Sequence, residues 1–511
     1  MEDSHGSVLA SARRFFSGTL LSRITGLGRD MAMAAAFGSS SSVAAFLVAF
    51  RLSQLLRRLL GEGALQTAFA PCFESLRAED PARAAHFFRA LTRSLSGLLL
   101  LIIFLAEIGL LTALWRGHWS SGTRELLILT ALLVPGCLCT CLYGLNASLL
   151  QCERRYFTPS VAPALFNIVM MVGMAIAATS SGPMRLLSLF CVAGLALEWL
   201  VTLIPAIRST RPHLSLPSTS KGDLRRLLKP LGLGILGVGG SVLSNALDPL
   251  FARIADPSGP AYLWYALRLQ QLPLALFGLA IAGAALPPLC RAIQDRDSAR
   301  YQSLLAFALR RTWSLMVPLT LFLILFAPAT INLTYGRGDF SPAAVSQTAA
   351  CLQIYALALL PTALTSLLAS AWYAQGQFRF PMLASLTSVA ASILWNSLAV
   401  LLFHAGPVAI AWATTVSATI NCIWLLIPLL RQHPLTQAVW PTILRSALAT
   451  TIAALTAYYL PWQASTLTRG FVSQLLDVAI PGLAFGLTLL LASRLAGERE
   501  LLGTLGIKYK I

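Results

Sequence analysis

Long apolar stretches, separated by short polar or charged segments, dominate this chain. A helix that crosses the hydrocarbon core of a bilayer needs about 20 mainly apolar residues. Spaced by that length, the apolar stretches predict fourteen membrane-spanning helices. These cover residues 12–37, 42–60, 86–112, 124–150, 158–180, 186–207, 226–252, 260–289, 305–332, 346–372, 380–403, 408–430, 440–460 and 473–495.

Composition supports this class. Of the 511 residues, 56% are hydrophobic and 11% are charged, and the mean hydropathy is +0.71. An average soluble domain carries about 25% charged residues. The predicted fold class is therefore an all-α polytopic membrane protein.

Lys and Arg gather in the predicted loops on the side of the N-terminus. Loops rich in these residues stay in the cytoplasm, so an even number of spans leaves both termini cytoplasmic. The net charge of +18 then reflects basic loops beside an anionic leaflet. Anionic membrane lipids are expected partners, and nucleic acid is not.

Four arginines interrupt the predicted spans, namely Arg23, Arg29, Arg51 and Arg268. A charged side chain at the centre of a bilayer costs about 3 kcal/mol or more, so such residues mark substrate pathways. Few carboxylates lie at comparable depth. This excess of positive charge predicts an anionic substrate, although each arginine could instead reach the interface or form a structural pair.

The segment SRITGLGRD at 22–30 carries Arg23 and Arg29 six positions apart, which is about 120° around an ideal helix. They share a face only if the helix bends, and the two glycines between them permit a bend. Two planar guanidinium groups on a bent helix suit a diphosphate, because each binds phosphate oxygens in a bidentate way. A structural pair between Arg29 and Asp30 is the alternative.

A weak internal repeat relates the two halves of the chain. Shifting residues 44–71 by 217 positions, onto 261–288, gives ten identities that include a shared RLxQL string. This shift pairs Arg51 with Arg268. Six predicted spans separate the paired helices, so the halves share one orientation and are related by an axis along the membrane normal. Arg51 and Arg268 are then expected to face each other across a central cavity.

These residues also carry a family resemblance. SRITGLGRD, followed by AFLVAFRLSQLLRRLLGEGALQTAFAP at 45–71, resembles the signature of the MurJ/MviN family, the lipid II flippases of peptidoglycan synthesis within the MOP transporter superfamily. Weaker agreement spans nearly the whole chain, through WYALRLQQLP at 264–273, TYGRGDF at 334–340 and WYAQGQFRFP at 372–381.

The resemblance implies two pseudo-symmetric six-helix lobes, a C-terminal helix pair that lines a hydrophobic groove, and alternating access of a cationic cavity. The corresponding domains are a first lobe at 1–210, a cytoplasmic linker at 211–225, a second lobe at 226–432, and the C-terminal pair with its tail at 433–511. The expected location is the bacterial cytoplasmic (inner) membrane.

Matching positions place the family's essential arginines at Arg23, Arg29, Arg57 and Arg268, with Asp30 and Glu62 in matching motifs. Together with Arg51 from the repeat, the candidate substrate-binding residues are Arg23, Arg29, Asp30, Arg51, Arg57, Glu62 and Arg268. Arg57 also lies near a predicted cytoplasmic helix end, where an orienting role is the alternative.

Asp248 resembles a cation-site aspartate of some family members, and a helix cap or a protonated carboxyl is the alternative. The chain departs from the family pattern at Ala44 and Leu267, where acidic residues are often found. Their loss leaves the cavity more positive.

The expected activity is flipping of lipid II to the outer leaflet, with the arginines holding its diphosphate. No metalloprotease, hydrolase or ATP-binding motif occurs, so neither an enzyme nor a cofactor is expected, and the membrane potential or a monovalent cation would supply the energy. Other cell-wall synthesis proteins are candidate partners. The alternatives are a flippase for another polyprenyl-linked saccharide, a MATE-like antiporter, which would need cavity carboxylates, and a scaffold without transport activity.

Overall fold

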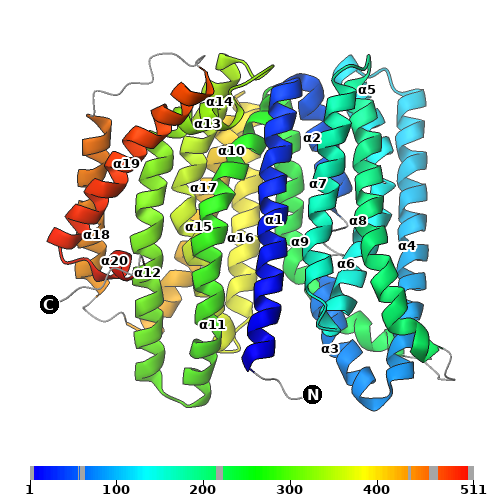
Figure 1. The fold of residues 1–511 in the computed structure, drawn as a ribbon, viewed down its shortest axis with the longest axis horizontal. Helices are drawn as coiled ribbons and strands as arrows, with labels where there is room; N and C mark the ends of the chain where they lie inside the picture. Colours follow the sequence, from blue (N-terminus) through cyan, green and yellow to red (C-terminus); the bar gives the residue numbers. More distant parts are fainter. Residues whose placement is uncertain are drawn as a thin grey trace. The chain divides into compact units, whose positions relative to one another are not determined.

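The structure, a computed structural model, describes residues 5–55, 57, 64–214, 223–434, 439–459 and 470–504. Within these ranges the chain consists of helices joined by short turns, and no strand occurs (Figure 1). The prediction of an all-helical polytopic membrane protein is confirmed.

The chain divides into two compact units, Met1–Leu250 and Phe251–Ile511. Unit 1 holds α1 His5–Phe37, α2 Ser41–Ser53, α3 Ala64–Glu79, α4 Pro81–Arg116, α5 Ser121–Leu133, α6 Gly136–Cys152, α7 Phe157–Ala177, α8 Pro183–Leu214 and most of α9 Asp223–Ala255. Unit 2 holds α10 Gly259–Pro273, the π-helix η2 Leu274–Gly278, α11 Leu279–Gln294, α12 Ser298–Leu325, α13 Ala327–Tyr335, α14 Pro342–Leu357, α15 Leu359–Ala374, α16 Arg379–Asn396, the π-helix η3 Ser397–Leu402, α17 Val408–Gln432, α18 Val439–Tyr458, α19 Phe471–Leu495 and α20 Arg499–Thr504.

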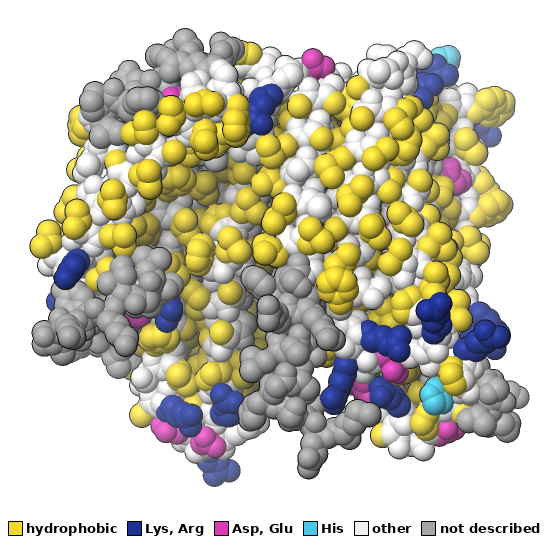
Figure 2. Space-filling model, viewed as in Figure 1, with side chains coloured by type: hydrophobic (Ala, Val, Ile, Leu, Met, Phe, Trp, Pro, Cys, Tyr) yellow, Lys and Arg dark blue, Asp and Glu magenta, His cyan; other side chains and the backbone are white. Residues whose placement is uncertain are grey.

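Each predicted span coincides with a helix of the described chain. Among the described residues, nine helices are long and apolar enough to cross a membrane, or ten if α5 and α6 form one bent span. The other four predicted spans correspond to α1, α2, α9 and α18. The span predicted at 42–60 is helical as α2 only to Ser53, and most of its remainder lies outside the described residues. On the face drawn in Figure 2, hydrophobic side chains cover the middle of the helices.

Two predicted spans, at 124–150 and 305–332, are each divided into two helices, which corrects the prediction of single helices. Proline cannot donate a hydrogen bond to the carbonyl four residues earlier, so it interrupts a helix. Pro135 lies at the break between α5 and α6, where the axis bends by 41°. Pro328 follows the break between α12 and α13. In the span predicted at 346–372, only Ala358 separates α14 from α15, and Pro342–Ala374 remains one apolar span of membrane length.

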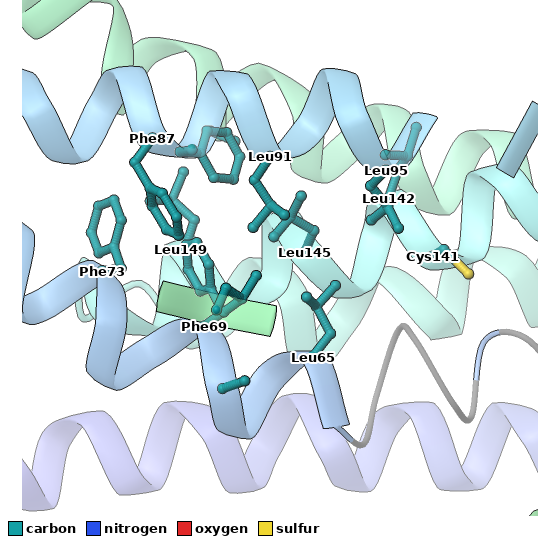
Figure 3. Packing of buried hydrophobic residues seen from close by; sticks show 14 of the residues in the cluster. Leu65, Phe69, Phe73, Phe87, Leu91, Leu95, Cys141, Leu142, Leu145 and Leu149 are labelled. Atoms are coloured by element: carbon teal, nitrogen blue, oxygen red, sulfur yellow. The ribbon is translucent and has the colours of Figure 1, made fainter. Parts of the chain in front are cut away.

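Helix α3 was not predicted as an element. It is amphipathic, and its apolar residues Leu65, Phe69 and Phe73 recur every four positions, which is the spacing of one helix face. These side chains are buried against Leu91 of α4 and Leu145 of α6 (Figure 3). This packing stabilises α3. The sequence did not predict α3 as a span because it lacks a long apolar stretch.

The two copies of the internal repeat both contain π-helical geometry. Under the shift of 217 positions, the π-helix η2 Leu274–Gly278 falls on residues 57–61. Arg57, the one described residue of that segment, also has π-helical geometry. π-Helical turns are rare and often occur at functional sites. The two halves therefore depart from α-helical geometry at equivalent positions.

Candidate functional site

Arg29 and Asp30 form a buried ion pair in α1. The Nε and Nη2 atoms of Arg29 both donate to Oδ1 of Asp30, at 3.1 and 2.7 Å. The two side chains are only 9% and 1% exposed. A buried cation is stable only when it is paired and hydrogen-bonded. The structural pair considered as an alternative for Arg29 is thus present.

Asn167 of α7 completes the surroundings of Arg29. Its Oδ1 accepts from Nη1 of Arg29 at 3.1 Å, while its Nδ2 donates to the carbonyl of Ser22 at 3.2 Å and to Oγ1 of Thr25 at 3.1 Å. A guanidinium has only donors, so the amide oxygen must face it. Asn167 therefore fixes the guanidinium between α1 and α7.

Sequence reasoning did not select Asn167. A signal was available, because the residue is an amide within the apolar stretch 158–180, and polar groups inside a membrane span usually have a structural or transport role. What the sequence lacked was a partner, since Arg29 is 138 positions away.

Arg23 lies in a different environment from Arg29. Helix α1 is continuous from His5 to Phe37, with Arg29 buried and Arg23 exposed. This difference agrees with the rotation of about 120° that six residues of ideal helix produce. A clamp made by both arginines on a bent helix stays a prediction.

Arg57 lies half-buried between Gln54 and Tyr143. Its Nη1 donates to Oε1 of Gln54 at 3.4 Å, and its guanidinium carbon lies 6.0 Å from the centre of the Tyr143 ring. Arg51 is half-buried on α2. Glu62 lies outside the described residues, so its part in the site stays a prediction.

Arg268 belongs to unit 2 and is half-buried on α10. Its guanidinium carbon lies 4.5 Å from the centre of the Trp264 ring, one helical turn away. An aromatic face attracts a cation, and the attraction increases when water is excluded. This contact orients Arg268. Whether Arg268 meets the arginines of unit 1 at one substrate stays a prediction.

Asp248 is half-buried near the end of α9. Among the residues that the structure describes, no three His, Cys, Asp or Glu side chains come together as a metal site. A monovalent cation held by one carboxylate and backbone carbonyls would not form such a group. The cation-site role of Asp248 therefore stays a prediction.

Comparison with known proteins identifies the family. The family described as Lipid II flippase MurJ matches residues 33–479. A probable lipid II flippase of Chlamydia muridarum is 34% identical over 420 residues, which cover 82% of this chain and 77% of that protein. The chain belongs to the MurJ lipid II flippase family. Members of this family are transporters, so the chain is a transporter and not an enzyme.

More distant relatives extend this match. The lipid II flippase of Burkholderia cenocepacia is 29% identical over 430 residues, covering 81% of this chain and 82% of that protein.

Solved structures agree on the fold. A lipid II flippase in an inward closed conformation matches with a TM-score of 0.76 at 22% identity, over 94% of this chain and 98% of that one. An inward-facing MATE multidrug transporter matches with a TM-score of 0.65 at 15% identity, over 83% of this chain and 99% of that one. Flippases and multidrug transporters share this fold, so the fold alone does not decide the substrate.

Proposed function

We propose that this protein flips lipid II from the cytoplasmic to the outer leaflet of the bacterial cytoplasmic membrane by alternating access. The main support is the buried, oriented guanidinium of Arg29. Three of its five N–H groups bond to Asp30 and Asn167, which leaves two donors for a ligand. A diphosphate is the lipid-linked anion that such a donor set suits best.

In this proposal Arg29, Arg57 and Arg268 bind the diphosphate of the substrate. Each is oriented by a neighbour, namely Asp30, Gln54 and Trp264 respectively. Held side chains lose less conformational entropy on binding. The polyprenyl tail would lie in a groove beside the C-terminal pair, α18 and α19.

The proposed transport step is a movement of the two lobes. We propose that residues 1–210 and 226–432 rock against each other about a substrate bound between them, with 211–225 as a cytoplasmic linker and both termini in the cytoplasm. A ligand drives such a change only through different affinities for the two states. The diphosphate supplies that difference if the arginines converge in only one of the states.

The test is depletion of the protein in its bacterium, followed by measurement of lipid II accessible at the outer leaflet. Rescue copies would be wild type, Arg29→Ala, Arg268→Ala and Arg116→Ala. Arg116 is an exposed arginine at the end of α4 and serves as the matched control. We expect depletion to abolish exposure, and only wild type and Arg116→Ala to restore it. Unchanged exposure on depletion would contradict the substrate assignment and favour another polyprenyl-linked saccharide.

Anionic phospholipids are a second proposed partner of unit 1. Two exposed apolar stripes end in arginines. On α8, Ile204 and Ile207 are 54% and 49% exposed, and Arg208 and Arg211 continue the same stripe by helical spacing.

The second stripe is on α4. It begins with the exposed Arg89 and Arg93 and continues through Leu100 and Phe104, which are 53% and 62% exposed. Figure 2 shows Lys and Arg gathered at the lower right, where α4 begins and α8 ends.

These four arginines differ from their neighbours in pairing. Among the described side chains, none of the four has an ion pair, whereas Arg83 and Arg226 both pair with Asp223. Unpaired arginines that end a lipid-facing stripe suit the phosphates of the inner leaflet.

We expect phosphatidylglycerol to raise the unfolding temperature of the purified protein more than phosphatidylcholine does. The expected difference disappears when Arg89, Arg93, Arg208 and Arg211 are all changed to Gln. An equal effect of the two lipids on wild type would contradict this site.

A further inference from the structure

The C-terminal end of α19 is joined to α12 through a buried carboxylate. Helix α19 ends at Leu495, and Gly497 follows with a φ of +67°, a conformation that favours glycine. The N–H of Glu498 then donates to the carbonyl of Ser493 at 2.8 Å, which closes the helix as a Schellman motif does. This turn directs Glu498, which is only 1% exposed, toward α20.

The carboxylate of Glu498 accepts three hydrogen bonds. Its Oε1 accepts from the backbone N–H of Glu500 at 3.1 Å, and its Oε2 accepts from that of Leu501 at 2.8 Å. These bonds cap the N-terminus of α20, where free N–H groups favour negative charge. The third comes from Oγ of Ser314 on α12, at 2.9 Å. One carboxylate thus both starts α20 and binds it to α12.

Two further contacts strengthen this attachment. One helical turn from Ser314, Nε of Arg310 lies 3.0 Å from Oε1 of Glu500. Leu501 is buried in the same hydrophobic cluster as Leu315. Figure 1 shows α20 as the short helix between the end of α19 and the middle of α12. This end of α19 therefore rests on polar and apolar contacts together.

The opposite end of α19 is joined to α13 and its following turn. Gln474 is 2% exposed, and its Nε2 donates to the carbonyl of Gly336 at 3.1 Å. Arg337 donates to the carbonyl of Leu333 at 2.6 Å, and its guanidinium carbon lies 4.6 Å from the centre of the Phe471 ring. The turn within TYGRGDF is therefore attached to the first turn of α19.

Between its ends, α19 packs on α12 through aromatic rings. The ring centre of Phe485 lies 5.8 Å from that of Phe322 and 6.4 Å from that of Phe326, in edge-to-face arrangements. These rings belong to the same hydrophobic cluster as Ala449 and Ala453 of α18. Both C-terminal helices therefore share one core with α12.

We propose that Glu498 and Gln474 are positioning residues that hold α19 fixed against α12 and α13, so that the C-terminal helix pair moves with unit 2 as one body. The groove that the proposed function assigns to the polyprenyl tail then keeps one wall unchanged throughout transport. Only this last consequence rests on the proposed function. The attachment itself is a property of unit 2.

Hydrogen exchange tests the attachment without any assay of transport. In wild type, the amides of Glu500 and Leu501 in α20 and the first hydrogen-bonded amides of α19, from Gln474 onward, should exchange slowly. We expect Glu498→Ala to speed exchange in α20 by tenfold or more, and Gln474→Leu to do so at the first hydrogen-bonded amides of α19. Ser314→Ala, a milder change, should give a smaller effect in α20. Unchanged exchange in Glu498→Ala would overturn the proposal.

Matched controls lie beside both residues. Leu495→Ala shortens a side chain that is 89% exposed at the end of α19, and Ser473→Ala removes a hydroxyl whose one hydrogen bond among the described residues is to the carbonyl of Gly470. Both should change exchange by less than twofold. Effects as large as those of Glu498→Ala and Gln474→Leu would contradict a specific role for the buried residues.

Cross-linking tests whether the attachment persists during transport. Arg310→Cys and Glu500→Cys place thiols where two long side chains meet, so a short bifunctional thiol reagent can join α12 to α20. We expect the double-cysteine protein to flip lipid II, after cross-linking, within twofold of its rate before cross-linking. Where Glu498→Ala is added to the double-cysteine protein and slows flipping, we expect the cross-link to restore the rate. Loss of flipping on cross-linking would show that α20 must leave α12, which overturns the proposal. Absence of flipping by wild type would instead contradict the proposed function.

Discussion

At the scale of single residues, Arg29 shows how a membrane protein keeps a cation in an apolar region. An unpaired arginine there costs about 3 kcal/mol or more. Asp30 supplies the opposite charge and Asn167 supplies an oriented acceptor. The neighbouring carboxylate neutralises the cation without using all of its donors. A paired arginine can therefore still bind an anion, so the structural and functional readings of Arg29 are compatible.

Lysine at position 29 tests the geometry of that donor set. Arg29→Lys keeps the charge but cannot bond to both Asp30 and Asn167 as a planar fork does. We expect flipping to fall by about tenfold or more, because each hydrogen bond to a charged group is worth about 1.5–3 kcal/mol. The measurement is lipid II exposure in depleted cells.

Arg116→Lys is the matched control, because Arg116 is an exposed arginine at the end of α4, outside the candidate site. We expect it to flip lipid II within about twofold of wild type, since an exposed lysine can replace a point charge. Equal activity of Arg29→Lys and wild type would contradict a role for guanidinium geometry at position 29.

At the scale of elements, the start of α9 is held by an ion-pair clamp. Nε and Nη2 of Arg83 donate to the two oxygens of Asp223, at 2.9 and 2.6 Å. The Asp223 side chain is 2% exposed and lies in the first turn of α9, where a negative charge favours the helix. This clamp fixes the start of α9, which follows residues 215–222, to the start of α4.

Removal of the clamp should destabilise the protein more than removal of a surface pair. We expect Asp223→Asn to lower the unfolding temperature and to speed hydrogen exchange at the start of α9, because a bidentate contact to a buried carboxylate is lost. The control is Glu74→Gln, which removes a 3.5 Å pair with Arg77 whose side chains are 51% and 40% exposed. Exposed pairs contribute little. Equal effects of the two variants would contradict the clamp.

At the scale of the whole molecule, the balance of charges bears on which source of energy drives flipping. The chain has an excess of cations, with 38 Lys and Arg against 20 Asp and Glu, and its substrate carries a diphosphate. An inside-negative potential drives an anion outward by about 2.3 kcal/mol per charge for each 100 mV. A potential could therefore drive flipping without a nucleotide.

Proteoliposomes with an imposed potassium gradient test this source of energy. We expect flipping to be faster with an inside-negative potential than with none, and slower when the potential is reversed. Replacement of all sodium by choline in the same assay, with wild type and Asp248→Asn, separates potential from cation coupling. A rate that follows sodium and not the potential would support Asp248 as the coupling site and contradict the potential-driven step.

Much of the fold could be predicted from the sequence because the bilayer simplifies the problem. A span needs a fixed length of apolar residues, so the predicted spans coincide with helices of the structure. The prediction was wrong where two of these spans proved to be divided, near Pro135 and Pro328. Helix α3 was missed because its stability comes from packing by Leu65, Phe69 and Phe73.

Some contacts of the candidate site could be predicted from the sequence, and others could not. Arg29 and Asp30 are adjacent in sequence, so their pair could be considered as an alternative, and the structure contains it. Asn167 could not be linked to Arg29, and Glu498 could not be linked to Ser314, because 138 and 184 positions separate them. Contacts over such distances depend on how helices pack, and one sequence carries no direct signal of that.

By itself, the sequence determined that this protein spans a membrane with helices, that cations interrupt its spans and that it resembles lipid II flippases, because these properties follow from apolar length, residue type and short motifs. Only the tertiary structure decided which groups hold each arginine, where helices break, and how α19 is attached at both ends. The physical reason is that burial, hydrogen bonding and charge compensation are properties of neighbours in space, and the chain brings those neighbours together only when it folds.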